Sequence, residues 1–257
     1  MGPWGFVCFI GAGPGAADLI TLRGHQLLQQ ADVVLFDALT DATFRAYAPQ
    51  ALWVDVGKRG FCDTVKQSHI NALLLQYARS HHRVVRLKGG DPSVFGRLEE
   101  ELSTLASAGI ATQVVPGVTA AIAAAAAMQR PLTRRSRGRS VSLTTAVATS
   151  PTGEPLLRDS RSADTEVFYM AGRQLSALAH RLMQAGWPSH TPTCVVSRAG
   201  CSDQICSEHN LDQLHSASAL HAGRPSIVTV GVGAEPICPL PLQSPMADTQ
   251  RSPILIL

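Results

Sequence analysis

Residues 83–92 read Arg-Val-Val-Arg-Leu-Lys-Gly-Gly-Asp-Pro, an apolar run that ends in a glycine turn. Two further apolar runs end in such a turn, at Gly11-Ala12-Gly13-Pro14-Gly15 and at Pro116-Gly117-Val118-Thr119-Ala120. Three turns of this kind in the first half of the chain predict a parallel sheet whose strand ends open toward one face, where backbone amides can approach a ligand closely. We expect the functional site at that face.

Around these turns, the first half of the chain alternates strand-like and helical patterns. Apolar runs predict strands at 7–10, 33–36, 52–56, 83–87 and 112–115. Apolar residues at helical spacing predict helices at 19–31, 66–79 and 98–106, with Gly109 as a C-terminal cap, and an alanine-rich helix capped by Thr119. This alternation is typical of an α/β domain whose parallel sheet is covered on both faces.

Beyond residue 139 the pattern changes. Strand-like runs fall at 140–147, 166–170, 193–197, 204–207 and 226–232, and helical patterns fall at 174–185 and 211–221. Several of these strands are too close in sequence for a helical crossover, so we expect a mixed second sheet. The predicted organisation is an N-terminal α/β domain at 1–129, an arginine-rich linker at 130–139, a C-terminal α/β domain at 140–235 and a flexible proline-rich tail at 236–257.

Composition excludes several classes of protein. The 257 residues are 45% apolar and 16% charged, which is typical of a globular chain, and the net charge of +3 is too small for a general nucleic-acid binder. The six cysteines show no metal-ligand spacing, so we expect no metal and reduced thiols in the cytoplasm. No apolar run approaches the roughly 20 residues that a membrane helix requires, and the first residues lack the basic region of a signal peptide.

The first glycine turn has a rival interpretation. Gly11-x-Gly13-x-x-Ala16 after a strand matches a dinucleotide-binding fingerprint, and Asp37 at the end of the second strand could hold a ribose hydroxyl. This pattern would indicate a nicotinamide-dependent oxidoreductase. Pro14 argues against it, because proline removes an amide donor from the turn that should hold the pyrophosphate.

Taken together, the turns and their flanks occur in the order of a known family. The chain resembles the tetrapyrrole (precorrin) methyltransferases over about residues 5 to 233. The matching stretches are 7–15, Asp18-Leu19-Ile20-Thr21-Leu22, Gln30-Ala31-Asp32-Val33-Val34, Val56-Gly57-Lys58-Arg59, 83–92, 115–120, Pro131-Leu132-Thr133 and Phe168-Tyr169-Met170. So long an ordered series is far more specific than any single glycine turn.

The resemblance implies a fold, a methyl donor and a substrate. It implies two αβα domains that form a cleft, a homodimer, and S-adenosylmethionine bound between the domains. The substrate would be uroporphyrinogen III, methylated twice to give precorrin-2. Carried over residue by residue, the resemblance implies that the donor is bound by Pro14, Gly89, Gly90, Asp91, Val94, Thr119, Ala120, Met170 and Ala199.

The resemblance also implies the residues that carry the chemistry. Asp37 would accept a proton and Lys58 would donate one. The substrate carries eight carboxylates, and guanidinium groups pair with carboxylates through two hydrogen bonds. Four arginines close to one another, Arg134, Arg135, Arg137 and Arg139, are therefore candidates for substrate binding.

Structural roles remain open for several of these residues. Asp37 could cap a turn, Lys58 could be a solvated surface charge, Met170 could fill core space, and the arginines could form a solvated linker. The chain also departs from the family pattern at Ala38, Leu98, Arg134 and Ala146. These departures leave two alternatives open, a precorrin methyltransferase that acts at a later ring carbon and a regulatory subunit that binds the donor without turnover.

Overall fold

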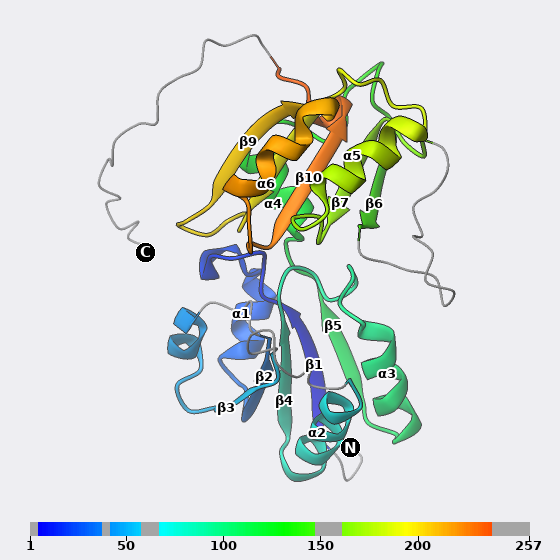
Figure 1. The fold of residues 1–257 in the computed structure, drawn as a ribbon. Helices are drawn as coiled ribbons and strands as arrows, with labels where there is room; N and C mark the ends of the chain where they lie inside the picture. The colour runs from blue at the N-terminus through cyan, green and yellow to red at the C-terminus, as the bar shows by residue number, and fades with distance from the viewer. Residues whose placement is uncertain (1–4, 38–41, 58–66, 147–160, 238–257) are drawn as a thin grey trace, which may run out of the picture.

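The computed structural model describes residues 5–37, 42–57, 67–146 and 161–237. Lys58, Ala38 and the stretch 238–257, which holds most of the expected tail, lie outside the described residues. Two five-stranded sheets lie one above the other along the long axis of the molecule (Figure 1). The N-terminal sheet is at the bottom of this view and the C-terminal sheet is at the top, so the α/β fold with two sheets that the sequence predicts is confirmed.

The first sheet is entirely parallel, as predicted. It contains β1 (Phe6–Gly11), β2 (Val33–Phe36), β3 (Leu52–Asp55), β4 (Arg83–Lys88) and β5 (Thr112–Val115). Its strand order is β3-β2-β4-β1-β5, with β1 paired to both β4 and β5. The carboxyl ends of β1, β4 and β5 therefore lie side by side, and each of these ends leads into one of the glycine turns.

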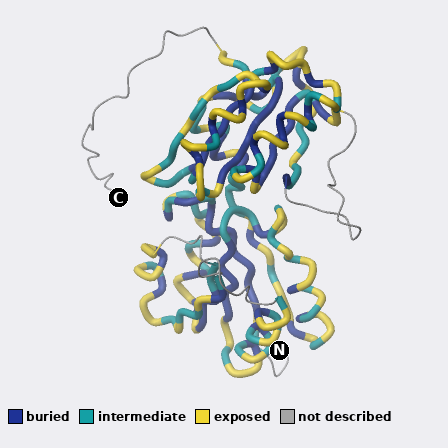
Figure 2. Tube along the Cα trace, viewed as in Figure 1, coloured by how far each residue is buried: buried dark blue, intermediate teal, exposed yellow. Residues whose placement is uncertain are grey.

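Helices cover both faces of this sheet, because alternate strand residues point to opposite sides. Val7 and Phe9 of β1 pack toward α2 (Gln67–Ser80) and α3 (Leu98–Ser107). Cys8 and Ile10 pack toward α1 (Leu22–Leu28) and the 3-10 helix η2 (Ala42–Tyr47). The three central strands, β2, β4 and β1, are consequently buried on both faces, as the dark blue trace in Figure 2 shows, whereas the edge strands β3 and β5 are more exposed.

Local capping decides where these helices begin and end. The prediction of one helix over 19–31 was wrong at both ends: a 3-10 turn, η1 (Ala17–Leu19), comes first, and α1 ends at Leu28. The helix α1 begins after Thr21, whose hydroxyl oxygen accepts a hydrogen bond from the Gly24 amide at 3.2 Å. Gly109 follows α3 in the left-handed conformation with φ of 68°, so the predicted C-terminal cap is confirmed.

The second sheet is mixed, again as predicted. It contains β6 (Val141–Thr145), β7 (Thr165–Tyr169), β8 (Pro192–Ser197), β9 (Ile205–Asn210) and β10 (Ser226–Gly231) in the order β6-β7-β10-β8-β9. Only β6 and β7 pair in parallel among the described strands of this sheet. One face is covered by α5 (Leu175–Gln184), η3 (Leu211–Ser216) and α6 (Ala217–Leu220), so the helix expected over 211–221 is 3-10 for its first half.

The other face of the second sheet is covered by α4 (Ala120–Ala127), which follows the last strand of the first sheet. Ala121 and Ala124 are buried in one cluster with Val167, Val196 and Ile227 of the second sheet. Because alanine side chains are small, the helix backbone can lie close to the strands. The chain therefore crosses from one sheet to the other at the glycine turn 116–120.

The arginine segment that follows α4 is anchored where it begins. The Arg130 side chain is 8% exposed and donates hydrogen bonds to the Cys194 Sγ at 2.9 Å and to the Ala234 carbonyl. It also pairs with Glu208 at 2.6 Å. Arg130 therefore belongs to the interior of the second half, and only the residues after it are exposed enough to meet a ligand.

Candidate functional site

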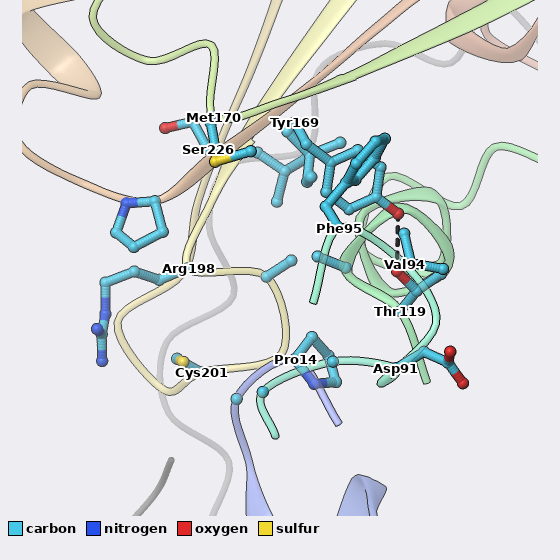
Figure 3. Close-up of a pocket in the computed structure, with 18 of the residues that line it drawn as sticks. Pro14, Asp91, Val94, Phe95, Thr119, Tyr169, Met170, Arg198, Cys201 and Ser226 are labelled. Carbon is cyan, nitrogen blue, oxygen red and sulfur yellow. Dashed lines mark hydrogen bonds between the residues drawn. The ribbon is translucent and has the colours of Figure 1, made fainter. Parts of the chain in front are cut away.

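A cavity of about 510 Å³ lies between the two sheets. The first sheet contributes the turns after β1, β4 and β5, and the second sheet contributes the ends of β7 and β8 and the start of β10. Because β10 runs antiparallel to β7 and β8, its first residues lie beside their last ones. Figure 3 shows side chains from both halves around this space. The site is therefore at the face that the glycine turns predict.

All nine residues predicted to bind the methyl donor line this cavity. They are Pro14, Gly89, Gly90, Asp91, Val94, Thr119, Ala120, Met170 and Ala199. The fold brings them together from positions that span most of the described chain. One cavity therefore gathers all of the residues that the resemblance assigns to the donor.

Further residues of the cavity were not predicted. Phe95, Tyr169, Arg198, Cys201 and Ser226 also line it. Phe95 and Tyr169 stand beside predicted residues in the sequence, so the quoted motifs could have pointed to them. Ser226 begins an antiparallel strand, and the argument from parallel strand ends gives no signal there.

The three glycine turns are packed backbone against backbone. A Cβ on Gly117 would lie 2.3 Å from the Gly90 carbonyl oxygen, and one on Gly11 would lie 2.5 Å from the Gly117 Cα. The Gly90 amide donates to the Gly13 carbonyl at 2.6 Å, and the Gly13 amide donates to the Gly90 carbonyl at 3.2 Å. No larger residue could take the places of Gly11 and Gly117 without moving the backbone.

These contacts also argue against a dinucleotide site at the first turn. The Gly13 amide is already bonded to the second turn, so it cannot hold a pyrophosphate. The helix α1 begins only at Leu22, well beyond the turn, whereas a dinucleotide fold places the helix N-terminus directly at the phosphates. The first turn therefore lacks both the free amide and the adjacent helix N-terminus that a nicotinamide dinucleotide would require.

Asp91 joins the turns after β4 and β5. One carboxylate oxygen accepts from the Gly117 amide at 2.8 Å, and the other accepts from the amide of Ser93 at 2.8 Å and from its hydroxyl. A carboxylate that accepts several backbone and hydroxyl hydrogens is held firmly in one orientation. Asp91 thus fixes the shape of the cavity floor.

Tyr169 connects the second sheet to α4. Thr119 stands at the N-cap position, but its side chain makes no capping bond, so the prediction of a Thr119 cap was wrong. The Thr119 hydroxyl instead hydrogen-bonds to the Tyr169 hydroxyl at 2.7 Å, and that hydroxyl accepts from the Ala121 amide at 3.3 Å. Burial raises the pKa of Tyr169, so the phenol stays neutral and serves this network from the opposite wall of the cavity.

Three cavity residues have strained backbones. Phe95, Met170 and Arg198 adopt φ values of 52°, 57° and 50°, which favour glycine. Such conformations cost about 1–3 kcal/mol each and cluster at binding sites. Arg198 is further held by Asp203, which accepts from its Nε at 2.7 Å and also pairs with Arg224 at 2.9 Å. The cavity is therefore shaped by the fold before any ligand enters.

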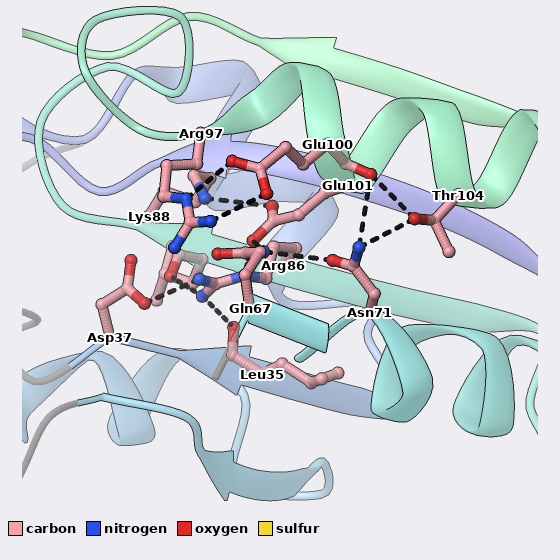
Figure 4. Close-up of polar contacts among 11 residues, drawn as sticks. Leu35, Asp37, Gln67, Asn71, Arg86, Lys88, Arg97, Glu100, Glu101 and Thr104 are labelled. Atoms are coloured by element: carbon pink, nitrogen blue, oxygen red, sulfur yellow. Dashed lines mark hydrogen bonds and ion pairs between the residues drawn. The ribbon is translucent and has the colours of Figure 1, made fainter. Parts of the chain in front are cut away.

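The two predicted proton-transfer residues are placed differently. Asp37 lies at the end of β2, where one carboxylate oxygen pairs with the Arg86 guanidinium at 2.7 Å (Figure 4). Its side chain is 30% exposed, and it is not among the residues that line the cavity. Lys58 lies outside the described residues.

The four candidate arginines do not line the cavity, and they divide into two pairs. Arg134 donates to the Glu235 carbonyl, and Arg137 pairs with the Glu235 carboxylate at 2.9 Å. Arg135 and Arg139 are exposed, and neither side chain has an ion pair with the described residues. Arg135 and Arg139 therefore keep their positive charge available, whereas Arg134 and Arg137 are engaged with Glu235.

The sequence of this chain is similar to those of known proteins. Residues 7–215 match the family described as Tetrapyrrole (Corrin/Porphyrin) Methylases. The chain is 39% identical over 230 residues to the uroporphyrinogen-III C-methyltransferase of Pseudomonas aeruginosa, covering 88% of this chain and 93% of that one. It is 43% identical over 228 residues to siroheme synthase 2 of Serratia proteamaculans, covering 88% of this chain and 49% of that one, so it spans about half the length of that relative.

A solved structure shares the fold. The uroporphyrin-III C-methyl transferase of Thermus thermophilus, solved in complex with S-adenyl homocysteine, superposes with a TM-score of 0.77 at 36% identity. The match covers 88% of this chain and 97% of that one. Within the described residues, no helix is long and apolar enough to cross a membrane.

Proposed function

This chain belongs to the tetrapyrrole (corrin/porphyrin) methylase family, and from this premise we propose that it methylates uroporphyrinogen III twice, with S-adenosylmethionine as donor. The product is precorrin-2, which feeds sirohaem and cobalamin biosynthesis. The observation that carries the proposal is the single cavity lined by all nine residues expected to bind the donor.

The cavity fits a ligand of nucleoside size. Its volume of about 510 Å³ is in the usual range of roughly 300–1,000 Å³ for small-molecule sites. At Gly90 the nearest neighbour of an added Cβ would be the Thr119 Cα at 3.9 Å, so the lack of a side chain leaves open space above the backbone. Gly89, Gly90, Thr119 and Ala120 would hold the donor against the first half, and Met170 and Ala199 would hold it against the second.

When bound, S-adenosylmethionine supplies a methyl group on a sulfonium, which is already a good leaving group. The task of the protein is therefore alignment, which can supply roughly 7–11 kcal/mol of the barrier. A new C–C bond forms from the ring π electrons as the C–S bond breaks toward sulfur. The alkylated ring then returns to neutrality by losing a proton, which Asp37 accepts in this proposal, and Lys58 acts as proton donor.

The substrate would be held by charge. Its carboxylates need cations outside the donor cavity, and Arg135 and Arg139 are exposed without an ion pair among the described residues. Arg134 and Arg137 would have to leave Glu235 before they could bind a carboxylate. We therefore assign the larger share of substrate binding to Arg135 and Arg139.

A homodimer and a cytoplasmic location complete the proposal. Ile122 of α4 and Leu143 of β6 are 53% and 41% exposed and line one apolar groove with Ala125, Ala126 and Val141. A second copy of the chain could cover this groove, and β6 is an edge strand of its sheet. Cys8, Cys194 and Cys206 are thiols, which suits a reducing compartment.

The test is an anaerobic incubation with uroporphyrinogen III and S-adenosylmethionine, in which S-adenosylhomocysteine release and product mass are followed together. The proposal predicts a product heavier by two methyl groups. Donor binding without S-adenosylhomocysteine release would instead indicate a later precorrin substrate or a regulatory role. Thermal stabilisation by NAD(P)H and not by S-adenosylmethionine would favour the oxidoreductase.

A further inference from the structure

The strand β4 carries two cations inside the first sheet. Arg86 and Lys88 are 2% and 4% exposed, although a central strand covered on both faces is ordinarily apolar. Because they are two residues apart, both point to the face that α2 and α3 cover. Buried charges of this kind are costly unless they are paired, so their partners decide what they do.

Glu101 of α3 neutralises only one of these two charges. Its side chain is fully buried, and its two oxygens accept from the Arg86 Nε at 3.2 Å and from the Lys88 Nζ at 3.0 Å. Gln67, the first residue of α2, donates to the same carboxylate at 3.1 Å. Two cations and one carboxylate leave the buried cluster with a net positive charge. Asp37, which pairs with Arg86, is the second carboxylate that balances this charge.

The Arg86 guanidinium is held in one plane by bonds from all three of its nitrogens (Figure 4). Nε donates to Glu101, and Nη1 donates to the carbonyls of Leu35 and Leu87 at 3.4 and 3.3 Å. Nη2 then donates to the Asp37 Oδ1 at 2.7 Å. Because Nε and Nη1 fix the plane of the guanidinium, the Nη2 donor points toward Asp37 in one direction only.

Asp37 is therefore held by one oxygen. Its Oδ1 is bound to Arg86, whereas the structure gives Oδ2 no hydrogen-bond partner among the described residues. The side chain is 30% exposed, so the carboxylate has one fixed side and one side open to its surroundings. This arrangement suits a group that must receive a proton from a bound substrate in a defined direction.

We propose that Arg86 is the positioning residue for Asp37: anchored by Glu101, it aims the Asp37 carboxylate at the substrate without touching substrate or methyl donor. The inference rests on the proposed function, because it takes Asp37 as the proton acceptor. Glu101 acts one step further away, since it holds Arg86.

The experiment is a double-mutant cycle on the full chain with Arg86→Lys, Asp37→Asn and the double variant. Arg83→Lys is the matched control, because Arg83 is exposed at the start of the same strand. The measurements are kcat for S-adenosylhomocysteine release, Kd for S-adenosylmethionine by calorimetry, and Tm. We expect Arg86→Lys to lower kcat by about 100-fold, the usual effect of a misplaced catalytic group, while Kd changes by less than about twofold.

The decisive result is the change in kcat that Arg86→Lys causes when Asp37 has already been replaced by asparagine. If Arg86 acts through Asp37, adding Arg86→Lys to Asp37→Asn lowers kcat by less than about twofold more. An equal loss of kcat in both backgrounds would overturn the inference alone. Wild-type kcat in Asp37→Asn would overturn the role of Asp37 and this inference, but not the proposed function. No turnover by the unmodified chain would overturn the proposed function itself.

A second variant keeps the test usable if Arg86→Lys does not fold. Glu101→Gln preserves the shape of the side chain but weakens the anchor of Arg86. It should lower kcat by about tenfold, again only when Asp37 is present. A loss of kcat in Glu101→Gln that is independent of Asp37 would contradict the positioning role.

Discussion

The glycine turns and the arginine segment 130–139 are both candidate ligand-binding regions, but they are held in place by different means. The turns are joined by backbone contacts, such as the bond of 2.6 Å from the Gly90 amide to the Gly13 carbonyl. The arginine segment is held by long side chains, and two of its members reach Glu235, about 100 residues further along the chain. Contacts between backbones leave little freedom, whereas long side chains can exchange partners.

This difference bears on what the two regions do. A donor that is the same throughout a family suits a rigid cavity, and a substrate with many carboxylates suits movable cations. Two of the departures from the family pattern lie in neither region. Ala146 is buried in the core of the second sheet, and Leu98 packs against the core beneath α3. These two residues therefore act on the packing of the fold, and on substrate binding only through that packing.

The largest expected effect comes from adding a methyl group to the packed turns. Gly117→Ala would place a Cβ 2.3 Å from the Gly90 carbonyl oxygen, where only backbone can move. Overpacking of this kind costs typically about 1–3 kcal/mol, so we expect a clear fall in Tm. Because the turns that line the cavity must move apart, we also expect about 100-fold weaker binding of S-adenosylmethionine by calorimetry.

The matched control for that substitution is Gly109→Asn. Gly109 also lies in a turn, but a Cβ there would meet nothing within 4 Å, and asparagine tolerates its positive φ. Donor affinity should be unchanged. Wild-type affinity in Gly117→Ala would show that the turns are less rigid than their contacts indicate.

An intermediate effect is expected from the arginines. Arg135→Ala with Arg139→Ala should raise KM for uroporphyrinogen III by at least about tenfold, because each charge-assisted bond contributes about 1.5–3 kcal/mol. Arg134→Ala with Arg137→Ala should lower Tm and change KM by less than about twofold. Steady-state kinetics and melting curves check both pairs. A larger rise in KM for Arg134→Ala with Arg137→Ala than for Arg135→Ala with Arg139→Ala would contradict this assignment.

The smallest effect concerns pH, in a part of the second half that belongs to neither region. His221 is fully buried and hydrogen-bonds to Ser197 and Ser207, at 2.8 and 2.9 Å. Burial lowers the pKa of His221, and likewise that of the neighbouring His209. Below about pH 6.5 the unfolded chain therefore binds protons that the folded chain does not, so stability is complete above that pH and is lost as the pH falls.

Melting curves at pH 7.5 and 5.5 measure this loss. We expect Tm to fall by a few degrees, and the fall to be smaller in His221→Gln, which begins from a lower Tm at pH 7.5. An identical fall in both proteins would show that other groups are responsible.

The sequence was informative wherever one local pattern decides a structure. Alternating apolar runs and glycine turns were enough to predict the parallel sheet, the mixed second sheet and the face that holds the cavity, because strand ends and turns are set by neighbouring residues. The family resemblance supplied the individual lining residues. The partner of Thr119 could not be foreseen, since Tyr169 is 50 residues away and competes with the helix cap.

The same reasoning explains what else was missed. Ser226 lies at the cavity because β10 runs antiparallel to β7 and β8, and this direction is fixed only by the pairing of the three strands. The pairing of Arg86 with Asp37 and Glu101 joins three elements, and nothing in the local pattern of β4 indicates that its cations are buried. Long-range side-chain contacts of this kind need the fold before they can be inferred.

The most direct test of the central claim is a crystal structure of this protein with S-adenosylhomocysteine. The account predicts electron density for the ligand in the cavity between the sheets, in contact with Gly90, Thr119 and Met170, with the three glycine turns unmoved. Ligand bound elsewhere, or bound there only after the turns separate, would contradict it.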